Sequence, residues 1–267
     1  MLRVLAGGLF LLISTVAAVK YSGGEKKLFE PAAGTIWTEA TTGMQFVWVP
    51  SGCFNMGSDK GRDNEKPVHN VCLKGFYLGK YEVTQAEYEK IVGKNPCAVA
   101  CNNYLGPDRA VVNLYREDAE ILAEKFGALT ANRFRLPSES EWEYACLAGG
   151  QHKEYCGDDR FLNNLGWIGG YTYGPKPVGG KKPNAWGLFD MMGNANEYVQ
   201  DCWHGNYVGA PNDGSAWIDG GYCHARLFRG GATRSHDSTY AKFRMQIEKD
   251  MDPAMFMDMG VRLVKMP

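Results

Sequence analysis

Eight cysteines constrain the fold of this chain more than any other feature. Their number is even, and they are spread through the sequence from residue 53 to residue 223. An even count in an exported chain is typical of a disulfide framework, although eight cysteines allow about a hundred pairings that sequence alone does not distinguish. Zinc is the weaker alternative, because the chain has no Cys-x-x-Cys pair. Proximity along the chain predicts the pairs Cys53–Cys72, Cys97–Cys101, Cys146–Cys156 and Cys202–Cys223.

The N-terminus has the pattern of an export signal. Arg3 precedes an apolar run over residues 4–16, and small residues follow it up to Ala18. This pattern predicts a signal peptide at 1–18 that is removed after Ala18. The alternative is an uncleaved anchor, but the apolar run is short of the roughly 20 residues that a spanning helix needs. We expect a secreted or periplasmic protein with no stable membrane span after signal cleavage, a polar lead-in over 19–43 and a domain over 44–267.

Composition narrows the class of protein. Hydrophobic residues make up 45% of the 267 residues, which is enough for a sizeable core. The net charge of −1 gives no broad electrostatic attraction to nucleic acid, so we expect no nucleic-acid partner. The 33 glycines, 7 tryptophans and 14 tyrosines favour a loop-rich fold held by aromatic side chains over a helical bundle. Composition therefore indicates a loop-rich α+β protein.

Local patterns place helices in the first half of the chain. A hydroxyl residue followed three positions later by glutamate, at 84–87 and at 138–141, predicts two helices that begin with capping boxes. Apolar residues at helical spacing predict another helix over 115–126. Residues 46–50 and 76–83 read as strands. After the last helix, glycine, asparagine and aromatic residues dominate, so we expect short strands and long loops.

Four motifs occur in a fixed order, at residues 134–145, 186–198, 229–231 and 260–263. Together they resemble the sulfatase-modifying factor, or formylglycine-generating enzyme, family, and the resemblance extends over most of the chain. It implies an α+β, loop-rich C-type-lectin-like fold of the formylglycine-generating-enzyme type. Fold alone does not assign a function, so the residues at each motif have to be considered separately.

Residues 190–197 are the best candidate for an ion site. Asp190 and Glu197 supply two carboxylates, and Gly193 between them allows the backbone to turn around an ion. Calcium prefers such carboxylate and carbonyl oxygens. In the family that the chain resembles this stretch holds calcium, which implies side-chain ligands from Asp190 and Glu197 and carbonyl ligands from Gly193 and Ala195. The alternative is a surface loop with solvated acidic side chains.

The motif Arg229–Gly231 is where the resemblance stops short of the family's chemistry. In the family, a serine and two cysteines follow this motif, and the two thiolates bind Cu(I), which prefers soft ligands. The corresponding positions here hold Ala232, Ser235 and Tyr240. We therefore expect no copper cofactor and no copper-dependent formylglycine synthesis, and the sequence does not decide whether the chain is an enzyme.

Polar residues around the same motif are candidates for a cleft that binds a ligand or acts on it, with catalytic roles unassigned: Arg229, Ser235, His236, Tyr240 and Arg244. Four arginines in this part of the chain, at 229, 234, 244 and 262, either line a cleft for an anionic ligand or lie buried in pairs with acidic residues, and we favour the second interpretation. Three histidines, at 204, 224 and 236, could hold iron as in some relatives. Separate surface or hydrogen-bonded histidines are the favoured interpretation.

Two functions fit these observations. The first is an exported family member without copper oxidase activity that serves periplasmic maturation of a peptide, protein or secondary metabolite. Relatives that mature pyoverdine-type siderophores also lack the thiol pair. The second is a non-catalytic, calcium-stabilised lectin-like binding module for a peptide, sugar or protein partner. In both cases the partner is a peptide, protein or small-molecule ligand that the sequence does not identify.

Overall fold

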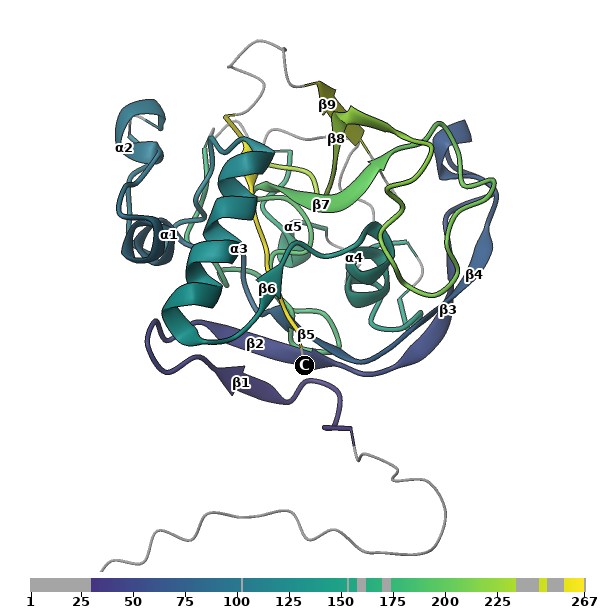
Figure 1. Ribbon diagram of the computed structural model, residues 1–267, viewed down its shortest axis with the longest axis horizontal. Coiled ribbons are helices and arrows are strands. Elements are labelled where there is room, and N and C mark those ends of the chain that lie inside the picture. The colour runs from purple at the N-terminus through teal and green to yellow at the C-terminus, as the bar shows by residue number, and fades with distance from the viewer. Residues whose placement is uncertain are drawn as a thin grey trace, which may run out of the picture. The chain divides into compact units, whose positions relative to one another are not determined.

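Two sheets and a hairpin carry the strands of the described part of the chain (Figure 1). The larger sheet has the order β1-β2-β5-β11-β6, with all neighbours antiparallel. It consists of β1 (Ile36–Thr38), β2 (Gln45–Val49), β5 (Phe76–Gly79), β11 (Val264–Lys265) and β6 (Phe134–Arg135). The C-terminal strand β11 therefore lies between β5 and β6, which are far from it in the sequence.

The second sheet has the order β10-β7-β8-β9. It is built from β10 (Met259–Gly260), β7 (Asn196–Trp203), β8 (Tyr222–Arg229) and β9 (Met245–Glu248). The pairs β7–β8 and β8–β9 are antiparallel, whereas β10 runs parallel to β7. A separate hairpin joins β3 (Gly52–Met56) to β4 (His69–Leu73).

The structure is a computed structural model and describes 30–101, 103–152, 154–157, 162–169, 174–233, 245–248 and 257–266. Side chains are described in these ranges except at 99–100 and 245–248. No helix in this part of the chain is long and apolar enough to cross a bilayer.

The helices follow the sequence patterns closely. They are α1 (Gln85–Val92), α2 (Cys97–Ala100), α3 (Arg116–Thr130), α4 (Glu139–Cys146), α5 (Leu162–Leu165) and a 3-10 turn η1 (Asp63–Glu65). Both predicted capping boxes are confirmed, since the hydroxyls of Thr84 and Ser138 accept from the backbone of Glu87 and Glu141, which bond back to the cap residues. The α3 helix continues four residues past its predicted end at residue 126.

Two predictions about strands need correction. The segment 76–83 forms a strand only as far as Gly79, because β2 and β11 pair with no residue beyond it. The polar lead-in predicted over 19–43 contains β1, a strand that the sequence analysis did not predict, whose residues pair with Gln45–Val47 of β2. A strand of three residues such as β1 is too short to show the alternation that marks a strand in sequence.

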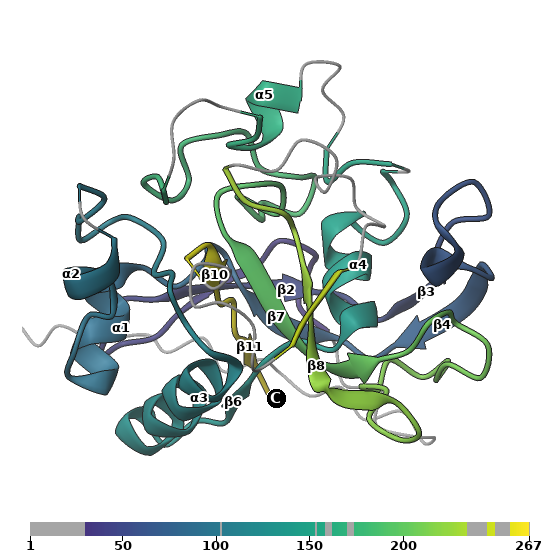
Figure 2. The same ribbon diagram turned by 90° about the horizontal axis from the view of Figure 1, so that it is seen from above.

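Helix α4 lies at the centre of the architecture. All eight of its residues are buried, including Glu139, Glu141 and Glu143. Figure 2 shows α4 between β7 and the β3–β4 hairpin, with α1, α2 and α3 on the other side of β7. The main hydrophobic core surrounds α4 and includes Trp142, Tyr144 and side chains from both sheets. A helix buried on every side brings its acidic residues into the interior, where they require partners.

All four predicted disulfides are confirmed. Cys53 pairs with Cys72, Cys97 with Cys101, Cys146 with Cys156 and Cys202 with Cys223. No cysteine of the chain is left as a thiol. Four disulfides are typical of an extracellular-type protein that folds in an oxidising compartment.

Candidate functional site

The motif at Arg229 forms the end of β8 and a sharp turn. Gly230 and Gly231 have φ angles of 94° and 75°, which glycine adopts without strain. The next residues, Ala232 and Thr233, are buried. The turn thus places Ala232 inside the protein at the position where the family it resembles carries a serine.

Arg229 is fully buried beneath this turn. Its guanidinium forms an ion pair with Glu143, and its Nε lies 3.6 Å from Oε1 of Glu139. It also lies over the ring of Trp142, 5.3 Å from the ring centre. Burial acts to lower the pKa of Arg229, but Tyr207, Glu143 and Glu139 outweigh it, so the pKa is raised. The arginine therefore joins β8 to α4 and exposes no surface to a cleft.

A second buried arginine holds the start of β7. Nε and Nη2 of Arg262 donate to Oε1 of Glu197 at 2.9 and 2.8 Å. The other oxygen of Glu197 accepts from Nε1 of Trp142 at 2.7 Å. Burial acts to lower the pKa of Arg262, but Glu197 raises it above its ordinary value. For these two arginines, the interpretation as buried pairs with acidic residues is confirmed; Arg234 and Arg244 lie outside the described residues.

The predicted ion segment forms part of a buried acidic cluster. Asp190 and Glu197 are both inside the protein, so the alternative of solvated surface acids is wrong. Oδ2 of Asp190 accepts from the backbone of Gly179 at 2.6 Å. Its Oδ1 is buried and has no hydrogen-bond partner among the residues that the structure describes. Such an atom is a candidate ligand for a cation.

Glu82 is a third acid of this cluster, which the sequence analysis does not identify. Its carboxylate accepts from the side chain of Asn194 and from the backbone of Ala195. It lies 112 and 113 positions from these residues, so no local motif marks it. Burial, with Asp190 and Glu197 close by, raises the pKa of Glu82 well above its ordinary value.

The cluster carries more negative than positive groups. Three carboxylates, from Glu82, Asp190 and Glu197, lie near the guanidinium of Arg262, and Lys181 also acts on Asp190, so the carboxylates still outnumber the cations. Burial raises the pKa of Asp190 to about 6, although the Gly179 hydrogen bond and Arg262 act to lower it. The described residues contain no group of three or more His, Cys, Asp or Glu side chains placed to hold a metal. A cation here would therefore need backbone carbonyls as well as carboxylates.

The remaining cleft candidates Ser235, His236 and Tyr240 lie outside the described residues, as does Arg244. His204 and His224 are described but lie in different places. His204 lies in the loop between β7 and β8, whereas His224 is exposed on β8, where its ring centre lies 5.8 Å from that of Tyr222. The described histidines therefore do not converge as an iron site would require.

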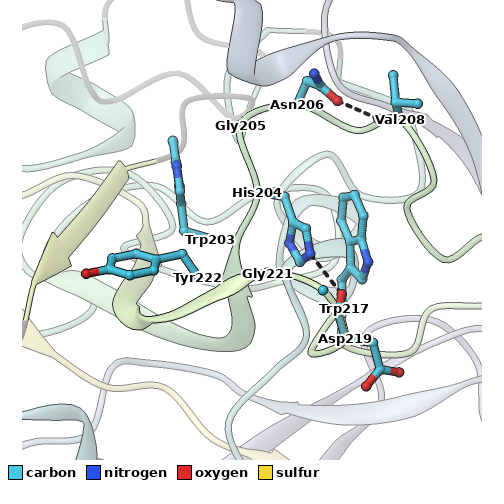
Figure 3. Close-up of a pocket in the computed structure, with 10 residues that line it drawn as sticks. Trp203, His204, Gly205, Asn206, Val208, Trp217, Asp219, Gly221 and Tyr222 are labelled. Carbon is cyan, nitrogen blue, oxygen red and sulfur yellow. Dashed lines mark hydrogen bonds between the residues drawn. The ribbon is translucent and has the colours of Figure 1, made fainter.

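An open pocket of about 510 Å³ lies in the loop between β7 and β8 (Figure 3). Its lining combines aromatic, polar and glycine residues: Trp203, His204, Gly205, Asn206, Val208, Trp217, Asp219, Gly220, Gly221 and Tyr222. The imidazole of His204 stacks on Trp217 with ring centres 3.5 Å apart. Sequence reasoning missed this pocket, although a loop of glycine, asparagine and aromatic residues closed by a predicted disulfide was a usable signal.

Comparison with known proteins gives the chain its family. The profile of the sulfatase-modifying factor enzyme 1-like domain matches residues 33–267. Formylglycine-generating enzyme from Bos taurus is 27% identical over 221 residues, covering 60% of this chain and 58% of that enzyme. A Mus musculus protein named inactive C-alpha-formylglycine-generating enzyme 2 is 28% identical over 232 residues, covering 65% of this chain and 74% of that protein.

Solved structures agree with the sequence comparison. PvdO from Pseudomonas aeruginosa superposes with a TM-score of 0.77 at 28% identity, covering 89% of this chain and 100% of that chain. This likeness confirms the predicted α+β fold of the formylglycine-generating-enzyme type. The chain spans about three fifths of the length of the formylglycine-generating enzymes from cattle and mouse that it matches. With the profile matching nearly all of the sequence, the chain belongs to the sulfatase-modifying factor, or formylglycine-generating enzyme, family.

Proposed function

We propose that this chain is an exported, ligand-binding member of the family that has no copper oxidase activity. One observation carries the proposal: every cysteine is in a disulfide, so no thiol is available near the Arg229 motif. The residue that follows the motif, Ala232, is buried and has no donor atom in its side chain. Cu(I) binds tightly to soft thiolates and poorly to hard oxygen ligands such as those of Ser235 and Tyr240.

Export is supported by the same disulfides. Four of them would not persist in a reducing cytosol. The N-terminal pattern of a signal peptide at 1–18 points the same way. A secreted or periplasmic location is thus part of the proposal. A C-type-lectin-like character of the fold is likewise proposed from the family resemblance.

Calcium is the ion proposed for the acidic cluster. The buried, unpartnered Oδ1 of Asp190 and the excess of carboxylates over arginine support a site for a hard cation. Asp190 and Glu197 would hold the ion through side chains, and Gly193 and Ala195 through carbonyls. Glu197 is already bonded to Arg262, so it would be shared between the two cations. Bound calcium would supply charge compensation and cross-link the turn before β7 to the core.

The decisive test of the proposed function is an oxidase assay. Purified, correctly oxidised protein is given a sulfatase-type cysteine peptide, oxygen and Cu(I), with bovine formylglycine-generating enzyme as the positive control. We expect the peptide mass to remain that of the cysteine form, and no stoichiometric copper in the protein by elemental analysis. Robust turnover with one bound copper would overturn the proposal.

Maturation of a peptide, protein or secondary metabolite is the second candidate function. Its support is the family resemblance, which includes relatives that mature siderophores and also lack the thiol pair; the chain is 28% identical to PvdO, a fold likeness that covers 89% of it. Its chemistry would depend on polar groups such as His236 and Arg244. Substituting both by alanine distinguishes the candidates: loss of a partner's binding with folding intact favours a binding module, and loss of substrate turnover with binding retained favours maturation.

A further inference from the structure

The loop between β7 and β8 forms a pocket that neither the acidic cluster nor the Arg229 motif uses. Its volume of about 510 Å³ falls within the range of about 300–1,000 Å³ that small-molecule sites occupy. Tyr222 is 49% exposed, and the neighbouring Val208 and Ile218 are 70% and 57% exposed. Large apolar side chains left open on one rigid loop are a common sign of a binding surface.

The loop is fixed in place rather than loosely attached. The Cys202–Cys223 disulfide joins the two strands at its base. Oδ1 of Asp201 accepts from the backbone of Trp217 at 2.8 Å, and Oδ2 of the same residue accepts from Glu139 at the start of α4. These contacts tie the far side of the loop to the core. A wall held in this way loses little entropy when a ligand binds.

His204 stabilises the loop that forms the pocket. Its Nδ1 and Nε2 lie 3.1 and 3.0 Å from the carbonyl oxygens of Cys202 and Asp219. One face of the ring stacks on Trp217. A Cβ at Gly221 would come within 2.3 Å of the ring, so only glycine allows the chain to approach this closely. The histidine is therefore a packing residue that fixes the position of Trp217 and of the loop backbone.

The polar part of the pocket is suited to hydroxyl groups. The Asn206 side chain is oriented because its Oδ1 accepts from the backbone of Val208 at 2.9 Å. An added Cβ at Gly205 or Gly220 would meet no atom within 4 Å, so the backbone there borders open space. The pocket thus offers aromatic faces beside amide, carboxylate and backbone groups that donate or accept hydrogen bonds.

Charge narrows the class of ligand. No lysine or arginine is among the described lining residues, so nothing there attracts an anion. Asp219 is the single acid, and Figure 3 shows its carboxylate pointing away from His204 and Trp217. A cationic ligand would need that carboxylate beside the aromatic rings. A purely apolar ligand would leave the polar groups without partners. The lining is therefore suited to a neutral molecule with an apolar face and several hydroxyl groups.

We propose that this pocket is a binding site for a neutral carbohydrate, whose ring stacks on an aromatic wall formed by Tyr222 and Trp203 while its hydroxyls bond to Asn206 and to the open backbone at Gly205 and Gly220. The proposal deepens the binding function proposed above, since it names the ligand class. It does not depend on calcium at Asp190. A short neutral peptide is the competing class, and the experiment below separates the two.

The test is a titration of the full, oxidised protein with a panel of neutral tetrasaccharides built from glucose, mannose, galactose or N-acetylglucosamine. Tryptophan fluorescence and saturation-transfer NMR report binding. We expect at least one sugar to bind with a Kd below about 10 mM and to receive saturation on its ring protons. Tyr222→Ala, at an exposed site, should weaken that binding at least tenfold, and Asn206→Ala should weaken it severalfold. The matched control Leu105→Ala, which removes a similarly exposed apolar side chain elsewhere, should leave binding unchanged.

The proposal is overturned if no sugar of the panel binds, if Tyr222→Ala binds as well as the parent protein, or if a neutral tetrapeptide competes for the pocket and the sugars do not. These outcomes are separable from failure of the proposed function. Copper-dependent turnover with intact sugar binding would reject only the proposal that the protein has no copper oxidase activity. Absence of turnover together with absence of sugar binding would reject only the carbohydrate assignment.

Discussion

Replacing Asp190 by asparagine should change how the stability of this protein depends on pH. Burial raises the pKa of Asp190 from 3.8 to about 6 in the folded state. The folded protein therefore holds this proton more tightly than the unfolded chain. Stabilisation from the protonated form is complete below the unfolded pKa and is lost as the pH rises through about 6. The difference of about 2 pH units corresponds to about 3 kcal/mol of unfolding free energy at about 1.4 kcal/mol per unit.

Asparagine is a conservative choice at this position. Asp190 has a φ of 54°, a left-handed conformation that asparagine also tolerates. The amide oxygen of asparagine can still accept from Gly179, so the substitution removes the charge and little else. We expect Asp190→Asn to lie within about 0.6 kcal/mol of the parent protein near pH 4 and to be more stable by about 3 kcal/mol at pH 7.5. Asp63→Asn, at an exposed site, serves as the matched control for an aspartate-to-asparagine substitution.

The measurement is denaturant unfolding between pH 4 and 8, with disulfides intact and a chelator present. A stability difference between the two proteins that stays constant over this range would refute the reasoning. Burial also raises the pKa of Glu82. Glu82 is present in both proteins and makes both less stable as the pH rises. It can therefore change the size of the stability difference between them but not its sign. Adding calcium gives the complementary result: the ion should stabilise the parent protein by mass action and stabilise Asp190→Asn much less.

Three further outcomes are expected. Glu143→Gln leaves the buried Arg229 with a weaker partner and should lower the unfolding free energy by about 3–5 kcal/mol in calorimetry or denaturant titration; a change near zero would show that other groups compensate the arginine. Replacing Cys202 and Cys223 by alanine should cost about 2–4 kcal/mol and also weaken sugar binding, whereas unchanged binding would mean that the base of the loop does not set the pocket. Intact mass should show a mature chain that starts near Val19 and gains the mass of eight hydrogens on reduction, and eight free thiols before reduction would contradict the disulfide assignment.

Sequence patterns predicted what depends on neighbouring residues. The caps at Thr84 and Ser138 and the pairing of nearby cysteines are local, and both are confirmed. The sequence analysis predicted that Arg229 and Arg262 pair with acidic residues, but it did not identify these residues, because they lie far along the chain. Glu82 was missed for the same reason, since its position opposite Asn194 depends on how the segment after β5 packs against the turn before β7.

The binding pocket was missed for a different reason. Its walls depend on the stacking of His204 on Trp217 and on the absence of a side chain at Gly221. Neither contact leaves a periodic signal in the sequence. The copper residues could be assessed from sequence, because the family motif fixes their positions relative to Arg229. The structure adds that the chain has no spare thiol to replace them.

The position of the C-terminal strands affects biosynthesis. Within a few residues, β10 joins the second sheet and β11 enters the first, and Arg262 between them neutralises Glu197. A chain that stops before residue 259 therefore lacks a strand in each sheet and leaves a buried carboxylate without its cation. Both sheets and the Arg262–Glu197 pair can therefore be completed only after residues 259–265 have been synthesised. Such a delay is compatible with passage through a translocation channel as an extended polypeptide.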